Sequence, residues 1–265
     1  MSSERTHQGG RSTRVVAVTE PTQQTTREPR VRREVVSFVR RSTRMRPQHL
    51  RAWERLRHDY VLEVPRQASS TSVEAGHRLD LSASFGRTAP LVVEIGSGTG
   101  ESLVAMAAAR PDVNVLAFEV YLPGIARTVS RLHDEQVGNV RLVQADAVEG
   151  LTQLLGPGAI SELWTFFPDP WPKARHHKRR LVDAAFADLL ATRLQPGGSW
   201  RLATDWADYA EQVREVLDGH PDFENAAGTA DGWAERLPAR PLTRFEQRGL
   251  DAGRTVRDLH YRREC

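Results

Sequence analysis

The sequence predicts an α/β protein in which helices cover both faces of a mostly parallel central sheet, preceded by a basic N-terminal extension. From residue 90 onward, short β-branched apolar runs alternate with segments of helical periodicity, which is the pattern of a parallel sheet. The first run, residues 91–95, leads directly into a glycine-rich turn. Charge marks the extension: residues 1–64 hold 14 arginines, no lysine and 7 acidic residues, whereas the whole chain has a formal net charge of +3.

The elements of the main domain are predicted from periodicity and from the residues that end helices. Five strands are expected at residues 91–95, 113–118, 140–144, 162–167 and 199–203. Helices are expected over residues 101–110, 123–136, 148–155, 178–194 and from about 205 to 217. Glycine and proline mark several helix ends, as at Pro111, Gly138 and Pro196. Two final strands are expected near residues 223–226 and 255–263.

The chain divides into three predicted parts. Residues 1–30 are polar with few large apolar side chains, so we expect a disordered basic tail. Residues 31–89 form a basic extension and linker, with a short helix over residues 48–60. Residues 90–265 form the main domain. The arginine-rich start favours a polyanionic partner such as a nucleic acid.

Several classes of protein are excluded by composition. No apolar run approaches the length that spans a bilayer, and the start carries no hydrophobic stretch of signal-peptide type. Cys265 is the only cysteine, so neither an intramolecular disulfide nor a cysteine-based zinc site is expected. The sequence therefore predicts a cytoplasmic protein without a metal centre or a membrane partner.

The glycine-rich turn predicts a nucleotide site. Gly96, Gly98 and Gly100 occupy alternate positions after the first strand, and Glu94 stands just before them. Glycines allow a ligand to approach the backbone closely, and the start of the following helix offers free N–H groups. A dinucleotide fingerprint would place its third glycine where Glu101 stands. The E-x-G-x-G-x-G spacing instead resembles motif I of Rossmann-like methyltransferases that use S-adenosylmethionine.

Acidic residues mark the carboxyl ends of the five strands, where ligands of open α/β sheets bind. They are Glu94, Glu119, Asp146, Asp169 and Asp205. Glu119 lies at the distance from the glycines where an acid accepts the hydroxyls of a ribose. Asp146 can accept a hydrogen bond from an adenine amino group, and Glu94 can pair with the cationic amino-acid end of a cofactor. Such acids suit a sulfonium and would repel a pyrophosphate, which favours S-adenosylmethionine over NAD.

The stretch from Phe166 to Arg180 predicts the substrate. Prolines on both sides stiffen the backbone around Asp169, and Trp171 follows. An aromatic ring beside a carboxylate suits a flipped-out purine. A basic run then suits phosphates, and its expected RNA-contacting residues are Lys173, Arg175, Lys178, Arg179 and Arg180.

Three motifs together resemble the tRNA (guanine-N7-)-methyltransferase family. They are F-F-P-D-P-W-x-K-x-R-H-x-K-R-R, then A-T-D-W at residues 203–206, and R-P-x-T-x-F-E-x-R-G at residues 240–249. The resemblance covers about residues 35–263. It implies a Rossmann-like class I methyltransferase fold, S-adenosylmethionine as cofactor, tRNA as partner, and methylation of the guanine at position 46 of the variable loop.

The resemblance also implies roles for single residues. Cofactor contacts fall on Glu94, Gly96, Gly98, Gly100, Glu119, Asp146 and Asp169, of which Asp169 is also the proposed catalytic residue. Contacts to tRNA or its guanine fall on Lys173, Asp205, Thr243, Arg244, Phe245 and Glu246.

Two other functions remain compatible with the sequence. One is a methyltransferase acting on an exocyclic amine or on another RNA base, because P-D-P-W distantly resembles the N/D-P-P-Y/F/W motif. The other is a non-catalytic tRNA-binding protein of the same fold. The sequence also leaves open which tRNAs are chosen and whether the protein is a monomer or a homodimer.

Overall fold

The structure of the chain is a computed structural model, and residues 45–264 are described. The tail expected over residues 1–30 and the first part of the extension, to residue 44, lie outside the described residues. Among residues 45–264, no helix is long and apolar enough to span a bilayer.

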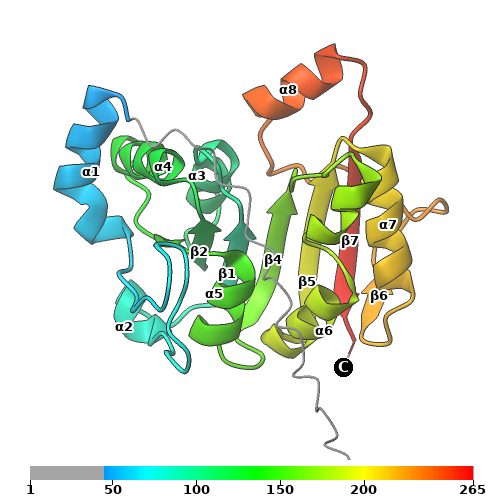
Figure 1. Ribbon diagram of the computed structural model, residues 1–265, viewed down its shortest axis with the longest axis horizontal. Coiled ribbons are helices and arrows are strands. Elements are labelled where there is room, and N and C mark those ends of the chain that lie inside the picture. Colours follow the sequence, from blue (N-terminus) through cyan, green and yellow to red (C-terminus); the bar gives the residue numbers. More distant parts are fainter. Residues whose placement is uncertain (1–44, 265) are drawn as a thin grey trace, which may run out of the picture. The chain divides into compact units, whose positions relative to one another are not determined.

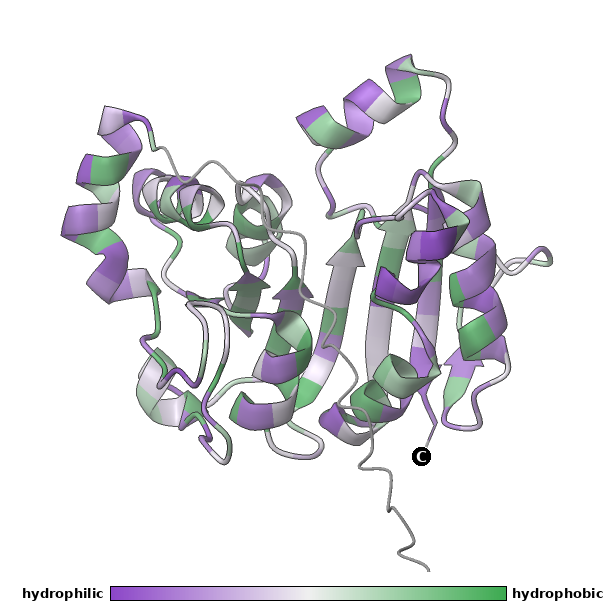
Figure 2. Ribbon diagram, viewed as in Figure 1, coloured by the Kyte–Doolittle hydropathy of each residue, from purple (hydrophilic) through white to green (hydrophobic). Residues whose placement is uncertain are grey.

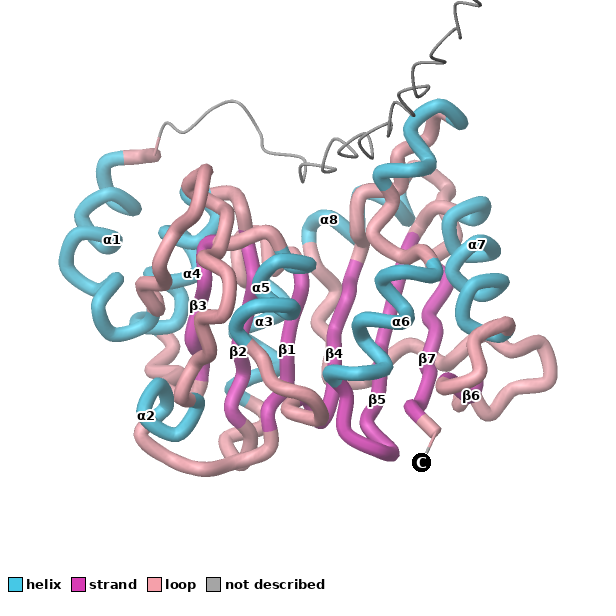
Figure 3. Tube along the Cα trace, turned by 60° about the horizontal axis from the view of Figure 1, so that its bottom comes forward, coloured by secondary structure: helices cyan, strands magenta, loops and turns pink. Residues whose placement is uncertain are grey.

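A seven-stranded sheet with the strand order β3-β2-β1-β4-β5-β7-β6 forms the centre of the domain (Figure 1, Figure 3). The strands are β1 (Leu91–Ile95), β2 (Asn114–Glu119), β3 (Val140–Gln144), β4 (Ile160–Phe166), β5 (Leu194–Thr204), β6 (Phe223–Asn225) and β7 (Arg257–Arg263). Neighbours among the first five strands pair in parallel, whereas β7 runs antiparallel to both β5 and β6. The sheet confirms the predicted fold class, and the strand order turns back at β1 and β4, where such sheets bind ligands.

Helices cover both faces of this sheet. They are α1 (Pro47–Tyr60), α2 (Leu81–Phe85), α3 (Glu101–Ala108), α4 (Leu122–Asp134), α5 (Ala147–Leu154), α6 (Ala184–Arg193), α7 (Ala207–Asp218) and α8 (Arg244–Asp251), with a 3₁₀ helix η1 at Ala174–Arg179. Alternate residues of β1 point to opposite faces. Val93 belongs to the apolar core that contains residues of α5, α6 and α7, whereas Val92 belongs to the core that contains residues of α1, α3 and α4. Figure 2 shows β1 and β2 as mostly hydrophobic, as expected of strands buried on both faces.

Residues 45–89 pack against the main domain. Leu56 of α1 joins the core that contains residues of α3 and α4, and Leu62 donates a backbone hydrogen bond to Leu142 of β3 (2.9 Å). Val64 and Val73 belong to the core on the opposite face. Residues 45–89 therefore contribute side chains to the cores on both faces of the sheet.

One prediction about helices was wrong, and helices α2 and α8 were not predicted. A single helix over residues 178–194 does not form, because Arg180 has an extended backbone (φ −60°, ψ 140°) and ends η1. A new helix, α6, begins only after Asp183, whose side chain accepts a hydrogen bond from the N–H of Phe186 (2.9 Å). Helix α8 was not predicted, although Thr243 with an acid three residues later is a known start signal.

Candidate active site

The turn after β1 has the backbone that its glycines predict. Gly96, Gly98 and Gly100 all adopt positive φ angles, of 76°, 59° and 75°. A Cβ atom at Gly96 or Gly98 would meet nothing within 4 Å, so protein packing does not occupy the open side of the turn. At Gly100, by contrast, a Cβ atom would lie 2.6 Å from Oγ1 of Thr128 in α4. The turn is therefore packed against α4 at Gly100 and free of protein contacts at Gly96 and Gly98, which suits a bound nucleotide.

Glu119 at the end of β2 holds this turn in place. Its carboxylate accepts hydrogen bonds from the N–H groups of Gly98 (2.7 Å), Val120 (2.7 Å) and Tyr121 (2.8 Å). Burial raises the pKa of Glu119, the three N–H groups oppose that shift, and the charge of Asp169 adds to it. Glu119 and Asp169 are therefore close enough to interact electrostatically, as expected of residues lining one site.

Glu94 is the most unusual acid of the site. Its side chain is buried, and Oε2 has no hydrogen-bond partner within the described part of the chain. Burial, followed by the charge of Glu119, raises the pKa of Glu94 to about 8. The Oγ atom of Ser97, in the glycine turn, is also buried without a partner among residues 45–264. A cationic group with N–H donors would satisfy both side chains, so these residues fit the amino-acid end of S-adenosylmethionine.

The raised pKa of Glu94 predicts how stability depends on pH. The folded protein keeps this carboxyl neutral up to about pH 8, whereas in the unfolded chain it ionises near the ordinary value of 4.5. Its contribution to stability is therefore fully present below pH 4.5 and is lost as the pH rises to 8. We expect Glu94→Gln to be more stable than the unmodified protein at pH 8, by about 1 kcal/mol or more. Urea unfolding of both proteins measures this difference.

The same comparison at pH 5 is the control, because this pH lies close to the value of 4.5 at which Glu94 ionises in the unfolded chain, so little of the contribution is lost there and the difference should shrink. Calorimetry at pH 8 should also show weaker binding of S-adenosylmethionine to Glu94→Gln, since the variant cannot supply a negative charge. A stability difference that does not change between pH 5 and pH 8 would contradict the buried, neutral state of Glu94.

Asp146 caps the helix that follows β3. Its Oδ1 accepts hydrogen bonds from the N–H groups of Val148 (2.9 Å) and Glu149 (3.3 Å) at the start of α5. The residue is half-buried. The cap fixes the side chain at the carboxyl end of β3, and its predicted contact with adenine remains a prediction.

The corner that carries Asp169 has a strained backbone. Phe167 and Trp171 adopt positive φ angles of 54° and 44°, which are unusual for bulky residues and occur mainly where the surroundings enforce them. The N–H of Phe167 donates to the carbonyl of Ala203 in β5 (2.7 Å). The guanidinium of Arg179 lies 4.9 Å from the ring centre of Trp171. These contacts present Asp169 as an exposed residue on a rigid turn.

Arg180 differs from the other residues of the basic run. Its side chain is only 1% exposed. It donates from Nε to the carbonyl of Pro170 (2.8 Å) and from Nη2 to Asp208 of α7. We therefore correct its predicted phosphate contact: Arg180 anchors the Pro-Asp-Pro corner to α7. The remaining predicted RNA contacts are exposed, at Lys173, Arg175, Lys178 and Arg179.

The predicted guanine-binding residues lie where α8 meets the ends of β4 and β5. Asp205, after β5, is paired with Arg254 (Nε to Oδ2, 3.0 Å). Thr243 caps α8 by accepting a hydrogen bond from the N–H of Glu246 (3.2 Å). Phe245 is exposed and packs on Phe167, with ring centres 5.3 Å apart. Arg244, also exposed, begins α8.

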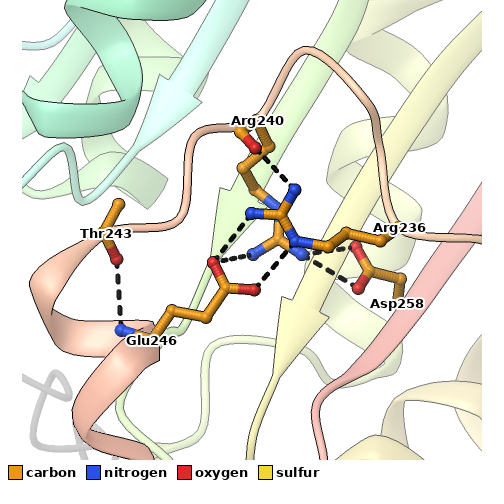
Figure 4. Close-up of polar contacts among 5 residues, drawn as sticks. All are labelled: Arg236, Arg240, Thr243, Glu246 and Asp258. Atoms are coloured by element: carbon orange, nitrogen blue, oxygen red, sulfur yellow. Dashed lines mark hydrogen bonds and ion pairs between the residues drawn. The ribbon is translucent and has the colours of Figure 1, made fainter. Parts of the chain in front are cut away.

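A buried ion cluster, which sequence reasoning missed, surrounds Glu246 (Figure 4). It consists of Arg236, Arg240, Glu246 and Asp258. Arg240, which is fully buried, pairs with Glu246 (3.1 Å) and donates from Nη2 to both oxygens of Asp258 (2.8 and 2.9 Å). Arg236 donates from Nε and Nη2 to the two oxygens of Glu246 (3.1 Å each). Arg240 also lies 5.3 Å from the ring centre of Phe167, which joins the cluster to the corner before Asp169.

The comparisons with known proteins agree with this geometry. Residues 88–259 match a family described as "Putative methyltransferase", so the protein belongs to the methyltransferases. It is 55% identical over 234 residues to a tRNA (guanine-N(7)-)-methyltransferase of Cutibacterium acnes, covering 88% of this chain and 85% of that protein. A tRNA (guanine-N(7)-)-methyltransferase of Nocardioides is 49% identical over 243 residues, covering 92% and 93%. The chain belongs to the tRNA (guanine-N7-)-methyltransferase family.

Among solved structures, an rRNA methylase from Streptococcus thermophilus is similar, with a TM-score of 0.46 and 16% identity over 67% of this chain and 88% of that chain. No group of three or more His, Cys, Asp or Glu side chains within residues 45–264 could hold a metal ion.

Proposed function

We propose that the protein transfers a methyl group from S-adenosylmethionine to N7 of the guanine at position 46 in the variable loop of tRNA, in the cytoplasm. The observation that carries this proposal is the meeting of two sets of residues at one edge of the sheet. Glu94, Glu119 and the glycine turn form an acidic cofactor site, and the charge of Asp169 reaches Glu119 from the rigid corner beside it.

The reaction requires positioning more than proton transfer. N7 of guanine has a free lone pair, so no base need remove a proton before attack. The N7–C bond forms as the S–C bond breaks, and the bonding electron pair stays on sulfur. S-adenosylmethionine, when bound, supplies the methyl group on a positively charged sulfonium. The residues of this chain must align the guanine lone pair with the methyl group and exclude water.

Each acid of the site has a proposed task. Asp169 orients the guanine and stabilises the positive charge that develops on the purine ring during methylation. Asp205 and Glu246 accept hydrogen bonds from N1–H and the 2-amino group of guanine. Glu119 receives the ribose hydroxyls of the cofactor through Oε2, which accepts only the N–H of Gly98 and retains a lone pair, whereas Oε1 already accepts from Val120 and Tyr121.

One assay tests this function. Purified protein, labelled S-adenosylmethionine and tRNA should yield 7-methylguanosine, identified by nucleoside mass spectrometry. A tRNA with adenine in place of guanine 46 should not be methylated, whereas a nucleoside methylated on an exocyclic amine would identify the alternative activity. If no methyl transfer occurs, calorimetry with S-adenosylmethionine decides between an inactive preparation and a non-catalytic tRNA-binding protein, because the latter would fail to bind the cofactor.

The exposed basic residues of the corner should govern the salt dependence of tRNA binding. We expect simultaneous replacement of Lys173, Arg175, Lys178 and Arg179 by alanine to reduce the slope of log affinity against log salt concentration. The reduction should be about 0.7 to 0.9 for each tRNA phosphate that the variant no longer neutralises. Filter binding at several salt concentrations measures the slope.

Arg262 provides the control for this experiment. It is exposed near the end of β7, and because β7 is antiparallel to β5 it lies at the opposite edge of the sheet from the predicted site. Arg262→Ala should leave the slope unchanged. An equal slope for the fourfold variant and the unmodified protein would remove the basic run from the RNA interface.

A further inference from the structure

The two predicted guanine acceptors are each covered by an arginine. Arg236 covers Glu246 and Arg254 covers Asp205. These arginines are themselves accessible, with side chains 39% and 41% exposed, whereas the side chain of Glu246 is only 2% exposed. Both arginines line one cavity of about 790 Å³. Glu246, Leu242 and Leu250 also line this cavity. Glu246 is therefore buried at this cavity beneath the more exposed Arg236, which is paired with it.

Arg236 presents to Glu246 the same hydrogen-bond pattern that guanine would present. Its Nε–H and Nη2–H groups, joined through one planar carbon, donate to the two oxygens of the carboxylate at 3.1 Å each. Guanine carries N1–H and its 2-amino N–H on the same planar N–C–N arrangement. A carboxylate cannot receive both planar forks in this way at once. Guanine can bind Glu246 only if Arg236 leaves it.

The departure of Arg236 would change the charge of the buried ion cluster. With Arg236 in place, two arginines balance Glu246 and Asp258, so the cluster is neutral. With Arg236 displaced by neutral guanine, one negative charge remains. Arg240 stays in place because it is fully buried and donates to both oxygens of Asp258. Methylation at N7 makes the purine ring positive, so the uncovered charge would favour the transition state over the bound guanine.

We propose that Arg236 occupies the guanine position on Glu246 in the free protein and is displaced by the substrate base, which uncovers a negative charge at the N1–H edge of the reacting purine. This inference rests on the proposed function, because it requires that Glu246 receives guanine. It adds a positioning residue, Arg236, that keeps the site neutral until a guanine arrives.

The test measures discrimination rather than affinity alone. Dissociation constants are determined for two forms of the same unmodified tRNA. One carries guanine at the nucleotide that the protein methylates, and the other is abasic at that nucleotide. Only the first form must displace Arg236, while both share every phosphate contact. The ratio of interest is the dissociation constant of the abasic tRNA divided by that of the guanine-containing tRNA. We expect Arg236→Ala to increase this ratio about two- to fivefold, since the guanine no longer competes with a half-exposed ion pair. Arg236→Gln, which retains one donor, should give an intermediate increase.

Arg248→Ala is the matched control. Arg248 is also exposed, its replacement removes the same charge, and it donates to the carbonyl of Arg244 rather than to an acid. It should leave the ratio unchanged. An unchanged or smaller ratio for Arg236→Ala, in a variant that melts within a few degrees of the unmodified protein, would overturn the displacement of Arg236. If the unmodified protein shows no preference for guanine over the abasic form, the guanine-binding role of Glu246 fails instead. If the proposed function itself is wrong, the methylation assay with nucleoside mass spectrometry would already fail to yield 7-methylguanosine.

Discussion

Replacing Asp169 by alanine is expected to lower kcat for tRNA methylation about 10²- to 10³-fold, the range seen when one group that stabilises developing charge is removed. Asp169 is exposed on the corner after β4, and its charge reaches Glu119. Binding of S-adenosylmethionine should weaken much less, because Glu94 and the glycine turn remain in place. Single-turnover kinetics and calorimetry measure the two effects separately.

Asp169→Asn distinguishes charge from hydrogen bonding at this position. An asparagine retains the shape and an acceptor oxygen but carries no charge, so it should recover little of the original kcat if the charge matters most. A variant with full activity would remove Asp169 from the mechanism. A defect confined to cofactor affinity would instead make it part of the cofactor site alone.

Gly124→Ala is expected to weaken S-adenosylmethionine binding at least tenfold. Gly124 lies in the first turn of α4, and a Cβ atom there would stand 2.2 Å from the carbonyl oxygen of Gly98. No real contact is so short, and a clash with backbone cannot be relieved by turning a side chain. Gly98 would have to move away from Glu119, to which its N–H donates. Calorimetry with S-adenosylmethionine measures the decrease in affinity.

Gly138→Ala is the control, because a Cβ atom at Gly138 would meet nothing within 4 Å. Its cofactor affinity should equal that of the unmodified protein. Overpacking at Gly124 should also lower the free energy of unfolding by about 1–3 kcal/mol, which a thermal melt would reveal. Unchanged cofactor affinity in Gly124→Ala would mean that the glycine turn is not the cofactor site.

The parts of the site that could be predicted are those encoded within short stretches of sequence. Strand β1, the glycine turn and Glu119 follow one another closely along the chain, and the hydrophobic pattern and the glycine spacing carry the information. Helix α8 was within reach as well, because Thr243 and Glu246 have the spacing of a helix start. The helix is short and contains Gly249, which weakens its periodic signal.

The remaining features depend on contacts between distant segments. The ion cluster joins Arg236 of a loop, Glu246 of α8 and Asp258 of β7, and no local pattern links these residues. Arg180 likewise stands in a basic run where nothing in the composition separates it from Arg179. Its burial depends on Asp208, 28 residues further along the chain. The close approach of Gly124 to the glycine turn also requires the packed structure.

The late position of β7 in the chain has a consequence for when the enzyme can begin to work. The strand lies between β5 and β6, and its second residue, Asp258, completes the ion cluster. A chain emerging from the ribosome delivers its first segments well before β7. The cofactor turn after β1 can therefore form early, but the ion cluster around Glu246 is complete only when β7 has been made. A nascent chain bound to S-adenosylmethionine is thus expected to be unable to modify the tRNAs that surround it during translation.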